Sequence, residues 1–443
     1  MGLLNLMKGV YRRMFPIKDI AHAVGLKPII SSDMQDKIDV WYKSYIGKAE
    51  WVDGDKVISL RTESSAVREL ANVALNEMSI NITNDKLDKI MLKVRERLDV
   101  YLQRGLALGA MVIKPLGEDK FQCIAQNGFI IFAMDADGNP TDIVFPEIKK
   151  IDKKTYFRLE RHVLTAQGLT IINKAYVSDS EKNLGREIPL SYVDEWAGYV
   201  AEVRFPVDRM IFGYYRNPND NTVDGSDMGV SIYDTALEKI RRADIQFGRL
   251  DYEFDSARRR IHADATMVKP APASLSGKAY ELDDIYVDVT GDKEDFFNEF
   301  SPALRQDGFI AGLEEYRRSI EFDIGLSYGD LSRPQYVEKT ATEINASKYR
   351  KRNTVNHIQT QLKACLDGLV FGLAFFNKQV TSGYEFSCEF KDSFLNDEQS
   401  EREEDRKDLA NNTLRRDEYR ARWRNETLEE AARNLPEVAD VEL

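Results

Sequence analysis

The chain has 443 residues, of which 43% are hydrophobic and 10% aromatic, enough to build two or three packed domains rather than a disordered chain. Its 74 acidic residues outnumber its 62 basic ones, and the net charge of −12 argues against a protein that grips nucleic acid over a broad surface. The cysteines Cys123, Cys365 and Cys388 are far apart and odd in number, so we expect buried thiols rather than disulfides.

The first hundred residues are predicted to be helical. The apolar residues of the start, from Leu3 to Val10, have helical spacing and predict an amphipathic helix docked on the protein, too short to span a membrane. Three capped helices should follow: one from Ser31 or Ser32 to about Ile46, one from Ser65 through Met78, and one capped by Thr83. The third should bury one face, made of Leu87, Ile90, Met91, Val94, Leu98, Tyr101 and Leu102.

After Gly105 and Gly109 the apolar period changes from about four to two, which predicts strands. The expected strands are Met111 to Lys114, Phe121 to Ala125, Phe129 to Met134, Ile143 to Ile148, Tyr156 to Leu164, Leu169 to Val177 and Tyr199 to Val203. The acidic segment from Asp135 to Asn139 lacks the glycine and glutamate positions of a calcium loop and is expected to be a hairpin turn. The fold class of this half is therefore α+β.

A long amphipathic helix is predicted from Ile232 to Ile261. Its apolar residues recur every three or four positions, and charges of both signs surround them, as in helices that pack against copies of themselves. The stripe consists of Ile240, Ala243, Phe247, Leu250, Phe254, Ala257 and Ile261. An insert follows, with a turn segment rich in Pro, Ser and Gly, the alternating strand Ile285 to Val289, and the aromatic patch Phe296, Phe297 and Phe300.

Two further helices and a charged tail complete the chain. A helix up to Ile324 should end at Gly325, a loop should span Tyr328 to Lys339, and the capping-box spacing of Thr340 and Glu343 should open a very long helix reaching Phe376. Short helices are expected around Asp397 to Leu409, Arg415 to Trp423 and Thr427 to Leu435, forming a satellite domain or a partly mobile tail.

No catalytic or cofactor motif is found: there is no phosphate loop, dinucleotide fingerprint, zinc-protease helix, paired CxxC or nucleophile elbow. His162 and the other three histidines have no metal-ligand spacing. We expect a non-enzyme without cofactor or metal. The alternatives left open are a nuclease, whose two-carboxylate or metal site would leave little signature, and a different structural subunit of a capsid or tail adaptor.

Several strings, in collinear order over about residues 100 to 405, resemble the portal proteins of tailed bacteriophages, closest to those of Listeria-type siphophages. The strings are GFIIFAMDADGNPTDIVF, YYRNP, DGSDMGVSIYDTALEKIRRAD, SPALRQDGFIAGLEEYRRSIEFDIGLSYGDL, EKTATEI and FKDSFLNDEQSEREED. This resemblance implies a portal fold: an α+β wing, long stem helices, a small β-containing clip, and a long helix to a helical C-terminal crown. The implied divisions are 1–229 wing, 230–262 first stem helix, 263–302 clip, 303–325 second stem helix, 326–339 tunnel loop, 340–378 long helix and 379–443 crown.

The resemblance also implies a function and partners. Such subunits form a ring, usually of twelve, at one capsid vertex of the virion, through which double-stranded DNA is packaged and ejected after assembly in the host cytoplasm. They dock the terminase motor, the head-tail adaptor and the capsid or scaffold protein, with no membrane involved. In this chain the implied DNA-channel residues are Tyr328, Arg333, Gln335, Tyr336 and Lys339. The implied stem interface is Ile240, Phe247, Leu250, Phe254 and Ile261, and the implied clip docking residues are Ile285, Val287, Phe296 and Phe297.

Overall fold

A computed structural model describes most of the chain. The described residues are 15–256, 260–264, 285–288, 297–300, 303–334, 341–380, 383–390, 398–411, 413–424 and 426–435. The chain divides into two compact units, one of residues 1–75 and 80–388 and one of residues 76–79 and 389–443, and each unit is described by itself. Helices make up 46% and strands 21% of the protein, so the fold is mixed, as the α+β prediction has it.

Helices dominate the N-terminal part. They are α2 (Ile17–Val24), α3 (Ser32–Tyr45), α4 (Thr62–Leu75), α5 (Asp85–Arg95) and α6 (Leu98–Leu108), with the strand β1 (Met78–Ile82) between α4 and α5. The predicted cap of α3 is confirmed, because the Ser31 hydroxyl accepts a hydrogen bond from the Met34 amide. The predicted docked helix at residues 3–10 lies outside the described residues.

The third predicted helix differs from the structure in two ways. Its cap is Asn84, whose side-chain oxygen accepts from the amides of Lys86 and Leu87, while the Thr83 hydroxyl instead accepts from the Glu385 amide. The helix is also split, because Arg97, with φ −122° and ψ 1°, leaves helical geometry between α5 and α6. All seven residues of the predicted face are nevertheless buried, since both helices keep the same side toward the core.

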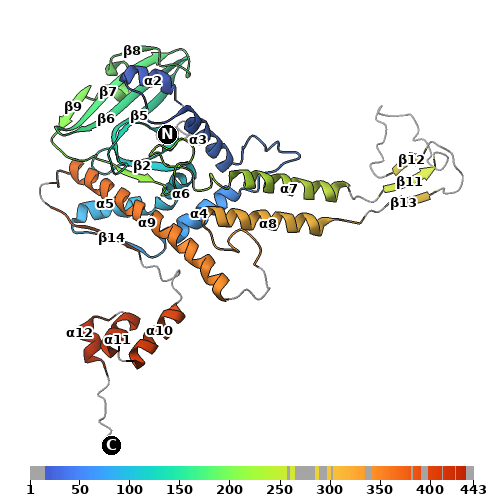
Figure 1. Cartoon of the computed structure of the whole chain (residues 1–443). Coiled ribbons are helices and arrows are strands. Elements are labelled where there is room, and N and C mark those ends of the chain that lie inside the picture. Colours follow the sequence, from blue (N-terminus) through green and yellow to red (C-terminus); the bar gives the residue numbers. More distant parts are fainter. Residues whose placement is uncertain are drawn as a thin grey trace, which may run out of the picture. The chain divides into compact units, whose positions relative to one another are not determined.

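Two antiparallel sheets form the central body of the first unit (Figure 1). The larger has the order β4-β5-β6-β7-β8, with β9 also paired to β7, and the smaller has the order β10-β2-β3. The strands are β2 (Ala110–Pro115), β3 (Phe121–Ala125), β4 (Ile130–Met134), β5 (Pro140–Ile151), β6 (Lys154–Thr165), β7 (Gly168–Ser178), β8 (Arg186–Ile188), β9 (Glu202–Phe205) and β10 (Gly213–Arg216). Short 3-10 turns are η1 (Gln126–Gly128), η2 (Leu190–Tyr192) and η3 (Asp194–Trp196).

The seven predicted strands are present, β3 with its predicted ends and the others with shifted ends, whereas β8 and β10 were not predicted. The predicted hairpin turn is confirmed: the Asp135 carboxylate accepts from the amides of Asp137 and Asn139 between β4 and β5. Alternation along β6 gives the large sheet two buried faces. Phe157 and Leu159 pack with α2 residues on one face, and Tyr156 packs with Trp196 on the other.

A helical hairpin leaves this body (Figure 1). It consists of α7 (Leu237–Ser256) and α8 (Gln306–Ile324), which we call the α7–α8 hairpin. Between them lies a three-stranded distal sheet of β11 (Arg260–Asp264), β12 (Ile285–Asp288) and β13 (Phe297–Phe300), in which the central β11 pairs parallel to β12 and antiparallel to β13. The predicted helix is thus too long at both ends, and Ile261 belongs to β11 rather than to the helix.

The 36-residue helix α9 (Ala341–Phe376) returns to the body. Its predicted apolar face is buried at Val355, Ile358, Leu362, Leu366, Leu369 and Leu373. Gly368 and Gly372 let its backbone approach the chain before β10, where a Cβ on Gly372 would lie 2.2 Å from the Ile211 carbonyl oxygen. The strand β14 (Phe386–Phe390) follows.

The second unit is small and highly charged. Its helices are α10 (Glu398–Ala410), α11 (Arg416–Arg424) and α12 (Leu428–Arg433), close to the three helices predicted. Thr427 and Glu430 form a capping box at the start of α12. Ion pairs such as Arg422–Asp405, at 2.9 Å, join neighbouring helices, and among the described residues of this unit after 390 Ala431 is the buried apolar one.

Candidate functional site

The α7–α8 hairpin is clamped by polar contacts along its length. Near the body, Lys239 pairs with Asp323 at 2.6 Å, and midway the Gln246 amide donates to the Phe309 carbonyl at 3.4 Å. At the far end the Arg305 guanidinium donates twice to Glu253, at 3.1 and 2.7 Å. A bidentate arginine pair fixes both distance and orientation, so the far ends of α7 and α8 are joined as well as their bases.

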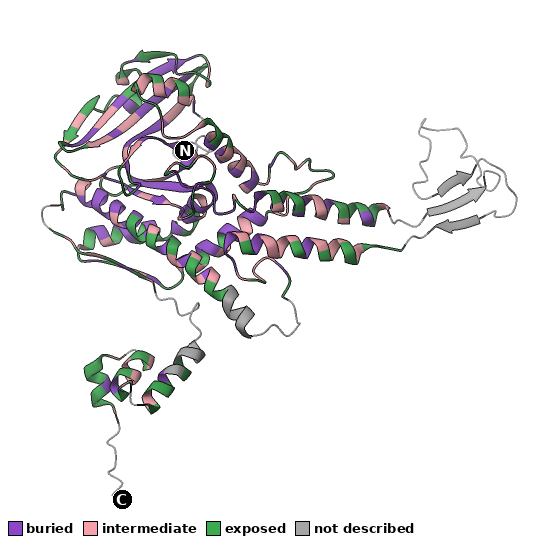
Figure 2. Cartoon of the chain, viewed as in Figure 1, coloured by how far each residue is buried: buried purple, intermediate pink, exposed green. Residues whose placement is uncertain are grey.

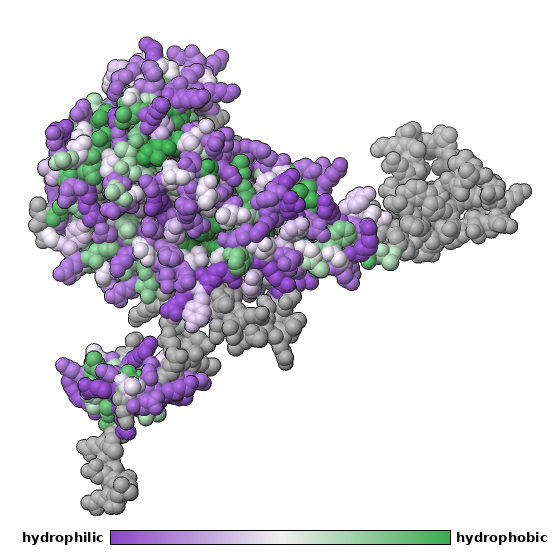
Figure 3. All heavy atoms as spheres, viewed as in Figure 1, coloured by the Kyte–Doolittle hydropathy of each residue, from purple (hydrophilic) through white to green (hydrophobic). Residues whose placement is uncertain are grey.

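The predicted apolar stripe of α7 loses its cover along the helix (Figure 2). Ile240 is fully buried, Phe247 and Leu250 are half-buried, and Phe254 is 45% exposed. Tyr252, beside the stripe, is 72% exposed. The visible face of the hairpin is mostly hydrophilic and interrupted by hydrophobic side chains (Figure 3). Within one copy of the chain, the outer half of this stripe is therefore incompletely covered.

A loop of the body wraps the root of α7. The Asp244 carboxylate accepts from the Trp51 indole and from the Leu60 amide, both at 2.8 Å. Gly248 lies against this loop so closely that a Cβ there would come within 2.1 Å of the Lys56 carbonyl oxygen. Any larger residue at position 248 would push the loop away, so this glycine is needed for the contact rather than for a special φ angle.

Two buried carboxyl groups meet at this root. Burial raises the pKa of Glu63 to about 7, with its Ser44 hydrogen bond and Arg61 opposing the rise and Asp244 adding to it. Burial also raises the pKa of Asp244, against its hydrogen bonds from Trp51 and Leu60. Glu63 is thus the carboxyl group of this root that titrates near neutral pH.

The α8–α9 loop (residues 325–340, described as far as 334) begins in a carboxylate lock. Glu321 Oε1 accepts from the amides of Gly329, Leu331 and Ser332, at 3.1, 2.6 and 2.8 Å. Its Oε2 accepts from the Ser332 hydroxyl at 2.9 Å. Because one carboxylate accepts from three amides and one hydroxyl of the loop, residues 329–332 are fixed to the end of α8.

The predicted channel residues fall into two groups, those within the described part of the loop and those beyond it. Tyr328 and Arg333 belong to the fixed part, where the Arg333 amide donates to Glu314 at 2.7 Å and the Tyr328 ring lies 5.0 Å from the Arg350 guanidinium carbon. Gln335, Tyr336 and Lys339 lie outside the described residues. The backbone of both residues is thus held by the protein, while their side chains are exposed, and the channel role of all five residues stays a prediction.

Three of the four predicted docking residues lie on the distal sheet. Ile285 and Val287 belong to β12 and pair in register with Ile261 and Ala263 of β11. Phe297 opens β13, and Phe296 lies outside the described residues. The sheet connects the far ends of α7 and α8, which puts it at the opposite end of the hairpin from the body (Figure 1).

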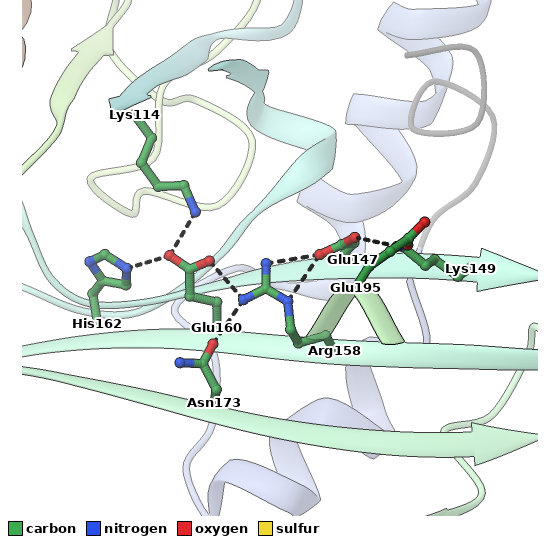
Figure 4. A network of polar contacts seen from close by, with 8 residues as sticks. All are labelled: Lys114, Glu147, Lys149, Arg158, Glu160, His162, Asn173 and Glu195. Atoms are coloured by element: carbon green, nitrogen blue, oxygen red, sulfur yellow. Dashed lines mark hydrogen bonds and ion pairs between the residues drawn. The ribbon is translucent and has the colours of Figure 1, made fainter. Parts of the chain in front are cut away.

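A buried charge network joins the two sheets of the body (Figure 4). Glu160 of β6 accepts from Lys114 of β2 at 2.7 Å, from His162 at 2.8 Å and from Arg158 at 3.1 Å. Arg158 also donates to Glu147 of β5 at 2.9 Å and to Asn173 of β7 at 2.8 Å. The sequence prediction missed this network, although Arg158, Glu160 and His162 alternate along one face of β6.

The network is electrostatically balanced. Burial opposes ionisation of Glu160, but Lys114, His162 and Arg158 outweigh it and hold its pKa well below the usual range. Burial lowers the pKa of His162, so the neutral ring donates from Nε2 to Glu160. Because each of its charges has an oppositely charged partner, the network fixes how the two sheets pack.

A surface hollow of about 880 Å³ lies at the turns of the large sheet, next to α3. Its lining holds four lysines and four acids: Lys150, Lys153, Lys154, Lys182, Asp39, Asp152, Asp179 and Glu181. Lys150 and Glu181 already form an ion pair. Because its charges cancel, this hollow is not suited to capture an anion or a cation.

Three further observations bear on chemistry. Among the described residues, no group of three His, Cys, Asp or Glu side chains could hold a metal ion. Burial raises the pKa of the Cys123 thiol to about 12, so this cysteine is a poor nucleophile. None of the described helices combines the length and apolarity needed to cross a membrane.

A scan of the chain against protein-family models finds no match, and a search of curated proteins finds none either. The function must therefore be argued from the chain itself.

Proposed function

We propose that this chain is a portal subunit of a tailed bacteriophage, without enzymatic activity of its own. Copies assemble into a ring, of twelve in the usual case, at one vertex of the capsid, and DNA passes through the ring during packaging and ejection. The observation that carries this proposal is the order of elements: an α+β body, a protruding helical hairpin with a small sheet at its far end, an anchored loop, a 36-residue helix and a separate helical unit.

In this proposal each region has a role. The body is the wing, the α7–α8 hairpin is the stem, the distal sheet is the clip, the α8–α9 loop is the tunnel loop, and the second unit is the crown. The incompletely covered stripe of α7 supports the stem role, because such a helix is stabilised by neighbours in a ring. The clip docks the terminase motor and later the head-tail adaptor, and the outer surfaces meet the capsid or scaffold protein.

The net negative charge of the chain is compatible with a channel through which DNA passes. Twelve copies at −12 bring a net charge of −144 to one ring, which repels rather than retains DNA. Contact through one or two cations of each tunnel loop is weak and blind to sequence. The protein would act in the host cytoplasm during assembly and in the virion thereafter.

The test is electron microscopy of the purified chain, paired with light scattering. We expect class averages of a closed ring with a central hole, and a mass of about 610 kDa, which is twelve times 50.8 kDa. A compact monomer with divalent-metal-dependent DNA cleavage would instead identify a nuclease, and an assembly without a central channel would indicate another capsid or adaptor subunit.

The tunnel-loop role needs a second experiment, in assembled heads. Deleting residues 335–339 removes the part of the loop beyond the Glu321 lock, and replacing the same residues by Gly and Ser keeps its length as a control. We expect both variants to form rings. Loss of DNA packaging or retention in the deletion variant supports the role, and normal DNA-filled heads contradict it.

A further inference from the structure

Exposed aromatic rings gather around one arginine where α8 ends and α9 begins. Phe322 is 60% exposed and Tyr328 is 41% exposed. The Arg350 guanidinium carbon lies 4.6 Å from the Phe322 ring centre and 5.0 Å from that of Tyr328, so both rings are within cation–π distance of this side chain. We call these three residues the aromatic cluster.

The backbone beneath the aromatic cluster is rigid. Gly325 closes α8 in the left-handed conformation, with φ 84°, and the Glu321 lock fixes the loop that carries Tyr328. On the α9 side, buried Lys351 pairs with Glu69 at 2.7 Å and with Asp330 at 3.0 Å. Because this backbone is already fixed, a partner that binds here loses little free energy to ordering the chain. Such a site can bind more tightly than a mobile loop of the same area.

The chemistry of the aromatic cluster fits a protein partner better than DNA. Aromatic rings and arginine are the residues enriched at the energetic centres of protein interfaces. Lys351, the neighbour of Arg350 in sequence, is already paired with two carboxylates, so Arg350 is the cation that the aromatic cluster offers. Duplex phosphates would gain this one cation and leave the exposed rings in water.

The chain itself carries a matching surface. The outer half of α7 exposes Tyr252 and Phe254 next to the exposed carboxylate of Asp251. Rings and a carboxylate are what an aromatic cluster with a central guanidinium would bind. The two surfaces involve different residues, so contact between them is front-to-back, the arrangement that closes into rings rather than into two-fold dimers.

We propose that the aromatic cluster of one copy receives the outer half of α7 of the next copy. This inference rests on the proposed ring and deepens it by naming the contact and its geometry. Because Lys239 pairs with Asp323, Phe322 lies level with the base of α7. Phe254 lies about 20 Å further along the α7 axis, counted from Lys239 at about 1.5 Å per residue. The hairpins of neighbouring copies are then staggered by about this length, which inclines them to the ring axis.

Photo-crosslinking tests the contact directly. Phe322→benzoylphenylalanine is placed in assembled protein made from equal parts of light and isotopically heavy chains, with and without duplex DNA. We expect crosslinks from one isotopic form to residues 249–256 of the other. Assembled rings that crosslink elsewhere, or that crosslink only to DNA, overturn the inference and leave the proposed ring standing.

Substitutions supply the second readout. Phe322→Ser and Tyr252→Ser should each raise the protein concentration at which half the chains are assembled by about tenfold or more, as expected when an interface anchor is truncated. Tyr192→Ser removes a similarly exposed ring from the body and should leave this half-assembly concentration unchanged. Circular dichroism verifies folding of each monomer. Unchanged assembly of both cluster variants overturns the inference alone, while a wild-type chain that never assembles overturns the proposed ring as well.

Discussion

The body and the α7–α8 hairpin use charge in opposite ways. In the body, ionic groups are enclosed and paired across strands, as around Glu160, and apolar side chains cover both faces of the large sheet. In the hairpin, ion pairs clamp the outside, and apolar side chains such as Phe254 stay in water. Charge thus stabilises the interior of the body, whereas in the hairpin it joins two helices whose apolar stripe is only partly covered.

The largest effect is expected in the body. Glu160→Gln keeps the shape of the side chain but leaves Lys114 and Arg158 buried with one fewer anion, so we expect the free energy of unfolding to fall by about 3–5 kcal/mol. Urea denaturation of the isolated chain measures this loss. Glu202→Gln, on an exposed position of β9, is the matched control and should change stability by less than about 0.5 kcal/mol.

In the hairpin the expected effect is on assembly instead. Phe247→Asp places a charge on the half-buried stripe, which should abolish ring formation while costing the monomer only about 1 kcal/mol. Light scattering and microscopy measure assembly. Arg249→Ser shifts the net charge in the same direction from an exposed position of α7 and should still form rings. Rings of Phe247→Asp indistinguishable from wild type would refute the stem assignment.

The root between body and hairpin should respond to pH. Folding raises the pKa of Glu63 from 4.5 to about 7, so between these pH values the unfolded chain releases a proton that the folded chain keeps. Stability should therefore fall as pH rises through this interval, by at most about 3 kcal/mol, and level off above it. Glu63→Gln should flatten the profile measured by denaturation at pH 5, 6 and 7.5. The same slope in both proteins would contradict the assignment.

The smallest effect is local. Glu321→Gln weakens the hydrogen bonds to the α8–α9 loop, each worth about 1.5–3 kcal/mol when the acceptor is charged. We expect faster amide hydrogen exchange at Gly329, Leu331 and Ser332, with global stability little changed. Glu315→Gln, an exposed carboxylate on the same helix, should leave these amides protected. Unchanged protection in Glu321→Gln would mean that the loop is held by other contacts.

Much of the fold could be predicted because periodicity reports burial. The buried face of α5 and α6 was predicted residue by residue, since apolar side chains at helical spacing leave one way to bury them. Ends were less predictable. Ile261 continues the helical spacing of α7, yet the chain leaves the helix after Ser256 and pairs Ile261 with Ile285 of a strand distant in sequence. Such pairing is not visible in local pattern.

The candidate site could be predicted only in part for the same reason. The position of the loop followed from Gly325 and Pro334, which interrupt helices, but its lock did not, because nothing in the sequence marks Glu321 as the acceptor for amides eight to eleven residues away. Conversely, the sequence did contain a pattern that indicates the buried network. Three polar residues occupy alternate positions of β6 and so share one face of the sheet: Arg158, Glu160 and His162. The function remains a proposal, resting on element order and resemblance.

The Trp51 contact gives the protein a built-in optical reporter. Of its four tryptophans, Trp41 and Trp196 are deep in the body and Trp423 belongs to the second unit, while Trp51 donates to Asp244 at the root of α7. If the hairpin tilts relative to the body, the indole loses this bond and meets water. A red shift of Trp51 emission, in a chain whose other tryptophans are replaced by Phe, would therefore report movement of the hairpin in real time without any attached label.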